Sequence, residues 1–284
     1  MQTIAVIAPG AMGGAVAGRL AENGVRVLTS LTGRSAATRA RAEDAGMTHA
    51  EDAEIVAADL ILSIVPPADA AALATRLAPS LATAAKKPVY VDLNAVSPAT
   101  VHGIAATIAA TGTPFLDGAI LGLPPKPGAK GPRIYVAGDD LAPLLALRQC
   151  GLDMRACEGG VGAASGLKMA YAGINKGLRA LAAIVVLGAE RAGAGAALRA
   201  ELAESEPELL ARFAAGFPDM MPKAHRWVAE MHEIADFLAP DRAGDQVFAG
   251  AAEVFARLAA SEGEADVAAL LAFAEAAGGS SRTR

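Results

Sequence analysis

Residues 4–14 have the sequence IAVIAPGAMGG, in which a short apolar run leads directly into a glycine-rich turn. The run Ile4–Ile7 is typical of a buried strand, and Gly10–Glu22 has the composition of a helix. A strand, such a turn and a helix together begin a nucleotide-binding βαβ unit. The turn matches the G-x-G-x-x-G pattern with Ala8 at its first position, where a small residue still allows the chain to turn.

The residues of this turn have separate expected roles. Gly10 would let the backbone approach a pyrophosphate, and Gly13 would let the helix pack closely on the strand. Ala11 and Met12 lie between them at the helix N-terminus, where free N–H groups and the helix dipole favour an anion. We therefore predict that Gly10, Ala11, Met12 and Gly13 bind the phosphates of a dinucleotide. The alternative is a simple tight turn in a chain rich in Ala and Gly.

The end of the second strand indicates which dinucleotide binds. NAD-binding proteins usually carry an acid there, which holds the ribose 2′-hydroxyl. Residues 25–35 contain no acid and end in Thr32, Gly33, Arg34 and Ser35. Because a guanidinium and hydroxyls suit a 2′-phosphate, we predict that Thr32, Arg34 and Ser35 bind NADP(H). The alternative is that the arginine belongs to a solvated helix face.

Apolar runs alternate with Ala-rich helical stretches through the first half of the chain. The runs after Ile4–Ile7 are residues 25–28, 60–65, 89–93, 115–121 and 134–137. Continuous rather than alternating apolar strands are typical of a parallel sheet covered on both faces. The sequence therefore predicts an α/β fold with a Rossmann-type doubly wound sheet at its N-terminus.

Ligands of such sheets bind beyond the carboxyl ends of the strands. Val65 and Pro66 close one apolar run and are candidate cofactor contacts. Asn94 follows another run and is a candidate for holding the nicotinamide ribose or the substrate. Turn formation before Ser97 and Pro98 is the alternative role of this asparagine.

No convincing strand follows Gly162, so the second half is predicted to be all-helical. We expect a dinucleotide-binding domain over residues 1–160 and a helical substrate and dimerisation domain over residues 161–284. Breaks between helices are expected at Pro218, Pro222 and Pro240. The expected helices are residues 165–191, 198–213, 222–238, 246–262 and 264–276.

Composition excludes several classes of protein. Hydrophobic residues make up 53% and charged residues 19%, as in a globular protein rather than a disordered one. The net charge of −5 gives no sign of a nucleic-acid or membrane partner. Two cysteines and four dispersed histidines suggest neither a disulfide framework nor a metal site. A cytoplasmic protein that binds a small-molecule substrate is expected.

Several segments, in order along the chain, resemble motifs of the β-hydroxyacid dehydrogenase superfamily, which includes 6-phosphogluconate dehydrogenase and the imine reductases. The resemblance covers about residues 3 to 235 and is closest to a phosphogluconate-dehydrogenase-like subgroup. The segments that carry it are residues 10–13, 33–35, 92–98, 117–122, 160–168 and 222–224, with residues 226–228. It implies a Rossmann domain followed by a helical domain, and homodimers built across the helical part.

The resemblance implies that Lys168 is the catalytic residue. Hydride transfer to or from an alcohol carbon requires movement of the hydroxyl proton, which a lysine can perform when a neighbouring cation lowers its pKa. Lys168, Tyr171 and Asn175 have i, i+3 and i+7 spacing and would share one helix face. Tyr171 either hydrogen-bonds the substrate or packs, and Asn175 is a candidate replacement for a family asparagine. The alternative for Lys168 is a solvated helix residue.

The chain departs from the family pattern at several positions. Tyr171 and Ala172 replace two asparagines of the family motif, and Leu121 replaces a serine that helps to hold a carboxylate. The Pro-rich loop from Gly122 to residue 133 is expected to reshape the substrate pocket. Leu121 and Gly122 are therefore candidate substrate contacts. Lys126 or Lys130 of the loop could contact an anion, although loop lysines are usually solvated.

Two further candidate substrate contacts, Lys223 and Trp227, lie in the helical half, where a solvated amphipathic face is the alternative. Together these features predict an NADP-dependent oxidoreductase acting on a β-hydroxy acid or a related alcohol or carbonyl. An imine reductase on the same scaffold is the first alternative. Lys168 argues against it, because known imine reductases commonly have another residue at this position. Leu121 argues for it, because loss of the serine favours a substrate that depends less on a carboxylate. The second alternative is an NADPH-binding protein that has lost catalysis.

Overall fold

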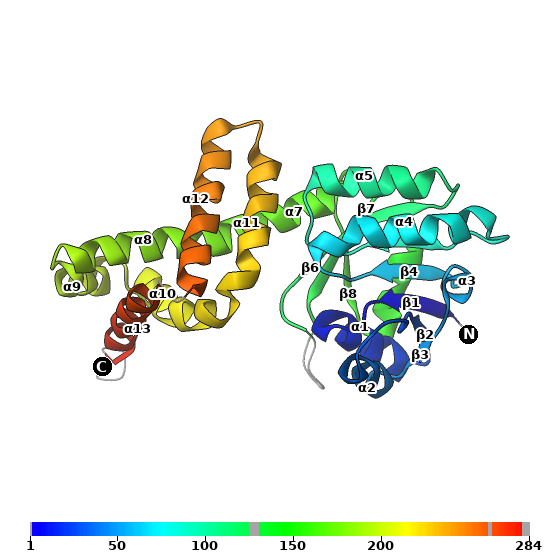
Figure 1. The fold of residues 1–284 in the computed structure, drawn as a ribbon, viewed down its shortest axis with the longest axis horizontal. Coiled ribbons are helices and arrows are strands. Elements are labelled where there is room, and N and C mark those ends of the chain that lie inside the picture. Colours follow the sequence, from blue (N-terminus) through cyan, green and yellow to red (C-terminus); the bar gives the residue numbers. More distant parts are fainter. Residues whose placement is uncertain (1, 125–130, 261–262, 280–284) are drawn as a thin grey trace. The chain divides into compact units, whose positions relative to one another are not determined.

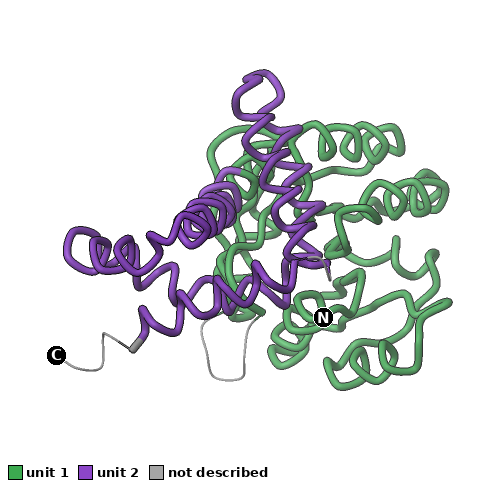
Figure 2. Tube along the Cα trace, turned by 60° about the vertical axis from the view of Figure 1, so that its left-hand side comes forward, with its two compact units in different colours: residues 1–169 green, residues 170–284 purple. Residues whose placement is uncertain are grey.

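The computed structural model describes residues 2–124, 131–260 and 263–279 and divides the chain into two compact units. The first unit comprises residues 1–169 and the second residues 170–284 (Figure 2). The division lies within a helix, nine residues after the expected domain boundary. The two units are described separately below.

The first unit is built on an eight-stranded sheet with the strand order β3-β2-β1-β4-β5-β6-β7-β8 (Figure 1). Neighbouring strands are parallel except for β6 and β7. The predicted Rossmann-type sheet is thus confirmed, with one antiparallel pair that the sequence did not indicate. The strands are β1 Thr3–Ile7, β2 Arg26–Thr29, β3 Met47–His49, β4 Leu60–Ser63, β5 Val89–Asp92, β6 Phe115–Leu121, β7 Arg133–Ala137 and β8 Asp153–Ala156.

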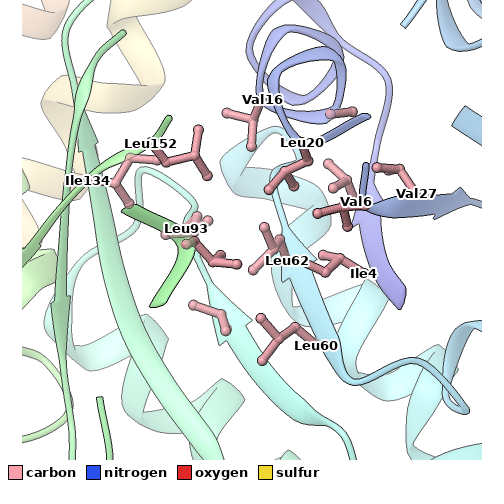
Figure 3. Close-up of a cluster of buried hydrophobic side chains, with 14 of the residues drawn as sticks. Ile4, Val6, Val16, Leu20, Val27, Leu60, Leu62, Leu93, Ile134 and Leu152 are labelled. Atoms are coloured by element: carbon pink, nitrogen blue, oxygen red, sulfur yellow. The ribbon is translucent and has the colours of Figure 1, made fainter. Parts of the chain in front are cut away.

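Helices cover both faces of this sheet. One apolar core joins Val16 and Leu20 of α1 to Ile4 and Val6 of β1, and it continues to Ile134 and other residues (Figure 3). The other core joins alternate strand residues, such as Ala5 and Ile7, to α4 and α5. The helices of this unit are α1 Ala11–Glu22, α2 Ala36–Asp44, α3 Asp52–Ile55, α4 Pro67–Thr83, α5 Pro98–Ala109 and α6 Ala142–Leu145, with a 3₁₀ segment, Ala146–Cys150.

A long helix runs from the first unit into the second. It comprises α7 Ala163–Ala172, a π-helical turn Gly173–Gly177 and α8 Leu178–Arg191. Cβ atoms at Gly173 and Gly177 would lie about 3 Å from the Phe248 ring, so these glycines allow the ring to pack against the turn. Among the described residues, this helix alone has the length and composition that would allow it to cross a membrane.

The second unit contains helices only, in its described residues. Stacked rings of Phe213 and Phe217 join α10 to Phe273 of α13, and Trp227 of α11 packs edge-on against Phe255 of α12. The helices that follow α8 are α9 Gly195–Ser205, α10 Pro207–Met220, α11 Ala224–Leu238, α12 Arg242–Ala259 and α13 Glu264–Gly279, with a 3₁₀ turn, Met221–Lys223.

The expected helix over residues 198–213 is wrong. The chain ends one helix at Ser205 and begins the next at Pro207, because proline fits the first turn of a helix but not its interior. Pro218, expected to break a helix, lies inside α10 near its end. Pro222 and Pro240 do lie between helices, as expected.

Candidate active site

The glycine-rich turn connects β1 to α1. Gly10 precedes the helix in extended conformation, and no side chain caps the helix there. The first-turn N–H groups, including those of Ala11 and Met12, have no partner within a helix. A Cβ at Gly13 would overlap the Ala8 carbonyl oxygen, whereas a Cβ at Gly10 would meet nothing within 4 Å. The packing expected of Gly13 is present, and the turn has the form that an anion-binding helix N-terminus requires.

A pocket lies beyond the carboxyl ends of β1, β2 and β4. Arg34 lines it, with Val65, and so do residues that the sequence analysis did not single out. The complete lining is Ile7, Ser30, Arg34, Val65, Asp69, Ala72, Leu73 and Arg76. Its two guanidinium groups fit a phosphorylated ribose, and its apolar residues fit a base.

The other residues after β2 make local contacts. Ser35 caps α2, its hydroxyl accepting from the Thr38 N–H at 3.3 Å. The Thr32 hydroxyl lies 3.4 Å from a carboxylate oxygen of Glu51, which also contacts His49. An acid therefore does lie near this strand end, contributed by the segment after β3. The sequence signal for it was absent because β3 was not recognised.

A row of paired residues crosses the sheet at this edge. Ile7, Ser63, Asp92 and Asp117 are register partners on β1, β4, β5 and β6. The three polar members of the row are fully buried. Burial raises the pKa of the Asp92 carboxyl to about 6, while hydrogen bonds from Asn94 oppose the rise and the nearby Asp117 adds to it.

Asn94 connects this row to the loop after β4. Its Nδ2 donates to Ser63 Oγ at 2.8 Å and to Asp92 Oδ2 at 2.7 Å, and its Oδ1 accepts from the Val65 N–H at 2.7 Å. Both amide hydrogens are therefore used within the protein. These bonds give Asn94 a structural role between β5 and the loop after β4, and they leave Oδ1 one lone pair for a ligand. A role of Asn94 in cofactor or substrate binding remains a prediction, as do those of Val65 and Pro66.

Asp117 connects the row to α7. Its Oδ2 accepts from the N–H groups of Gly162 and Ser165 at 2.9 and 3.0 Å, and its Oδ1 accepts from the Ser165 hydroxyl at 2.6 Å. Lys168 lies one helical turn after Ser165. Its Nζ donates to the Ile120 carbonyl at 2.7 Å. The candidate catalytic lysine is thus held against β6, in the same unit as the glycine-rich turn.

Leu121 and Gly122 lie at the end of β6, where the sequence departs from the pattern that it resembles. The side chain of Leu121 is almost fully buried, with 4% exposed. Gly122 has φ of +129°, and a Cβ there would contact Pro132. A substrate role of either residue remains a prediction. Lys126 and Lys130 lie outside the described residues.

The remaining candidates belong to the second unit. Tyr171 is exposed. The amide of Asn175 donates to the Tyr171 carbonyl at 2.8 Å and accepts from Arg212 at 3.0 Å. Because Asn175 lies in the π-helical turn, the 3.6-residue spacing used to align it with Lys168 does not extend to it. Its role beside Lys168, and that of Tyr171, remain predictions.

Lys223 and Trp227 lie close to α8. Lys223 forms an ion pair with Asp219, which also pairs with Arg179. Trp227 is buried, and the cationic groups of Lys176 and Arg179 lie 5.2 and 5.3 Å from its ring centroid. These contacts give both residues a structural role within the unit, and their substrate roles remain predictions.

Two family models match the chain. Residues 3–142 match the NAD-binding domain of 6-phosphogluconate dehydrogenase. Residues 189–258 match a domain of unknown function, DUF1932. None of the curated proteins is significantly similar in sequence to the chain.

Solved structures resemble the chain over almost its whole length. A conserved protein of unknown function, itself described as similar to 3-hydroxyacid dehydrogenases, is 27% identical; the match covers 93% of this chain and 99% of that one, with a TM-score of 0.72. The 3-hydroxyisobutyrate dehydrogenase of Mycobacterium tuberculosis is 20% identical, with 96% and 98% covered and a TM-score of 0.70. An imine reductase from Myxococcus stipitatus in complex with NADP⁺ is 18% identical, with 91% and 93% covered and a TM-score of 0.53.

The last two likenesses, at such low identity, concern the fold alone. The sheet order, the glycine-rich turn and the match over residues 3–142 agree on the first unit. Residues 3–142 are an NAD-binding domain of the 6-phosphogluconate dehydrogenase type, in a chain with the fold of the nicotinamide-dependent hydroxyacid dehydrogenases and imine reductases.

Proposed function

We propose that the chain is an NADP-dependent oxidoreductase that acts on a β-hydroxy acid or a related alcohol or carbonyl. The observation that carries this proposal is the placement of Lys168. The residue extends from a helix whose start is bonded to β6, in the unit that contains the dinucleotide-binding turn. A general acid or base must lie within hydrogen-bonding reach of the proton that it moves, and a fixed helix supplies such a position.

Different residues of the first unit would bind the cofactor and move the proton. The α1 N-terminus would bind the pyrophosphate, and the pocket lined by Arg34 would bind the adenosine end. Lys168 would accept the hydroxyl proton in oxidation and return it in reduction. Bound nicotinamide supplies the hydride acceptor or donor.

The experiment that tests this function is a substrate screen. The purified protein is incubated with NADP⁺ or NADPH and a panel of hydroxy acids, keto acids, aldehydes and cyclic imines. Absorbance at the reduced-nicotinamide band reports turnover. Turnover of hydroxy or keto acids is expected. Turnover confined to cyclic imines would favour the imine reductase, whereas NADPH binding without turnover of any compound would indicate a protein that has lost catalysis.

The imine reductase remains the second candidate because of Leu121. A buried leucine stands where the resembling family has a carboxylate-binding serine, and the site accordingly has one fewer hydroxyl for an acid substrate. The binding of a substrate without a carboxylate would be weakened less by this replacement. The screen decides between the two candidates by the class of compound that turns over.

The preference for NADP(H) over NAD(H) rests on Arg34 and gains support from Arg76 in the same pocket. The acids nearby that oppose this preference include Glu51, Asp69 and Asp52, and Asp52 pairs with Arg76 at 3.4 Å. Arg34→Ala should weaken NADPH binding by about 1–3 kcal/mol, the scale of a charge-assisted contact, and leave NADH binding almost unchanged. Fluorescence titration of each cofactor measures both affinities. NADH affinity equal to or tighter than NADPH affinity in the unaltered protein would refute the preference.

We also propose that the chain forms a homodimer through its helical half and resides in the cytoplasm. Large apolar side chains on the long helix are exposed: Ile174, Leu181, Ile184 and Val185. Exposed apolar patches of this kind mark interaction surfaces. A second copy is favoured over a bilayer because Lys176 and Arg179 lie among these residues along the helix, and charged groups are costly within a membrane.

A further inference from the structure

The start of α7 has a distant cap. An N-cap side chain normally accepts from the N–H of the third helical residue, which here is Ser165. The residue that precedes the helix is Gly162, which has no side chain to do so. Asp117 on β6, 48 residues from Ser165, accepts this N–H instead, together with the N–H of Gly162 itself and the Ser165 hydroxyl.

The bond between Asp117 and Ser165 and the bond between Ile120 and Lys168 join the same strand to the same helix. Asp117 and Ile120 are three residues apart on β6, and Ser165 and Lys168 are three residues apart on α7. Asp117 bonds to Ser165, and the Ile120 carbonyl accepts from Lys168 Nζ. The helix is therefore tied to the strand at two points, one of them the candidate catalytic group itself. Asp117 is fully buried and Ser165 is 1% exposed, so water does not compete for the first tie.

The segment before the helix needs this restraint. Gly162 has φ of +100°, in a region that favours glycine, and two further glycines lie at positions 159 and 160. Such a segment is flexible unless it is bonded to the surrounding structure. His102 of α5 supplies one such bond, its Nε2 lying 2.9 Å from the Val161 carbonyl oxygen. Asp117 supplies another, to the Gly162 N–H.

From this geometry we propose that Asp117 is a positioning residue for Lys168. It fixes the height and rotation of α7 on β6, and through them the place of the lysine side chain. The proposal rests on the proposed role of Lys168. Misplacement of a catalytic group by about 1 Å can cost roughly 100-fold in rate, so the effect is measurable.

Three substitutions distinguish the effect of Asp117 on the position of Lys168 from the effect of its charge and from a general loss of stability. Asp117→Ala removes every acceptor. Asp117→Asn keeps a carbonyl oxygen for the two backbone N–H groups and an amide that can donate to the Ser165 hydroxyl, so it keeps the position and loses the charge. Ser165→Ala is the matched control, because it removes only the hydroxyl bond and leaves both backbone bonds.

The first readout needs no substrate. The chain has seven lysines, and ¹³C reductive methylation gives each a resolvable NMR signal. The signal that Lys168→Arg removes identifies Lys168. In Asp117→Ala this signal should shift and narrow toward that of a freely moving lysine, while those of Lys86 and Lys87 remain in place. In Asp117→Asn and Ser165→Ala it should stay near its original position. An unchanged Lys168 signal in Asp117→Ala would overturn the proposal.

The second readout is a double-mutant cycle on turnover of the most active compound in the substrate panel with NADP(H). Asp117→Ala should lower kcat about 10- to 100-fold with little change in cofactor affinity, and Asp117→Asn should restore most of the activity. In the Lys168→Ala background, Asp117→Ala should cause no further loss. Equal losses in both backgrounds would show that Asp117 acts independently of the lysine and would refute the proposal.

The experiments distinguish failure of the catalytic role of Lys168 from failure of the positioning role of Asp117. A Lys168→Ala variant with near-normal turnover refutes the catalytic role and the positioning role together. A Lys168→Ala variant that is inactive, combined with additive losses at Asp117, refutes the positioning role alone. If Asp117→Ala does not fold, Asp117→Ser, whose hydroxyl is too short to span the same gap, replaces it. Failure of both to fold would assign Asp117 to stability and overturn the proposal.

Discussion

At the scale of single residues, Lys168 makes the most direct prediction. If it moves the substrate proton, Lys168→Ala should lower kcat by about 10²–10⁴, the range for loss of a general acid or base. NADPH affinity should barely change, because the glycine-rich turn is formed by other residues. Steady-state kinetics and a cofactor titration on the same preparation measure the two effects.

Lys168→Arg is the matched control for this prediction. Arginine keeps a positive charge and a donor for the Ile120 carbonyl, but it stays protonated and cannot cycle a proton. Activity should therefore remain low while thermal stability stays near that of the unaltered protein. Activity retained by the arginine variant would make the lysine structural. A loss in Tyr171→Phe as large as that in Lys168→Ala would instead assign proton transfer to the tyrosine.

Asp92 gives a prediction for the dependence of stability on pH. Its folded-state pKa of about 6 exceeds the ordinary value of 3.8, because burial disfavours the charged form. The folded state therefore binds more protons than the unfolded state between about pH 4 and 6, and this group's contribution is lost as pH rises through that window. The loss amounts to roughly 2–3 kcal/mol for a shift of this size.

Asp92→Asn cannot titrate, so it isolates that contribution. Urea unfolding of both proteins at several pH values from 4 to 7 measures the difference between their free energies of unfolding. This difference should move in favour of the variant by about 2–3 kcal/mol as pH rises, whatever the constant cost of altered hydrogen bonds to Asn94. A difference that is flat with pH would mean that the carboxyl of Asp92 titrates normally.

At the scale of elements, α1 offers two glycines with opposite expected behaviour. A Cβ at Gly13 would overlap the Ala8 carbonyl, so Gly13→Ala should displace the helix from the strand, destabilise the protein and weaken NADPH binding. Gly18 lies in the interior of the same helix, and a Cβ there would meet nothing within 4 Å. Gly18→Ala should therefore stabilise the protein by about 0.5–1 kcal/mol. Thermal unfolding of the two variants tests both signs.

The elements also show what could be predicted from the sequence. The apolar runs, such as residues 60–65, and the turn at Gly10 were recognisable because their signals are local. Strand Met47–His49 was missed, since it has three residues and only Met47 is buried. The bonds from Gly162 and Ser165 to Asp117 could not be predicted either, because they join residues 45 and 48 positions apart and produce no periodic pattern in the sequence.

At the scale of the whole molecule, two physical properties limited how well the helices of the second half could be predicted from the sequence. Alanine favours helix almost everywhere, so the start of α10 at Pro207 was hidden in a continuous helical pattern. The π-helical turn changes the rotational phase of the long helix after Gly173, and residue spacing alone cannot reveal such a turn. The predicted helical character of this half is nevertheless confirmed in its described residues.

The long helix supports the last prediction, which concerns assembly. Leu181, Ile184 and Val185 of α8 are three and four residues apart on one face of the helix, and their exposed fractions are 58%, 46% and 52%. This spacing is that of helices that pack along a shared seam. The unaltered protein should therefore sediment as a dimer at micromolar concentration, and Leu181→Glu with Val185→Glu should sediment as a monomer, because two buried charges on each copy would oppose association.

Val247→Glu is the matched control for this prediction. Val247 is 63% exposed but lies on α12, away from the seam in sequence, so this variant should stay dimeric. A monomeric unaltered protein would contradict the proposal outright, and a dimer that survives both glutamates would place its interface elsewhere.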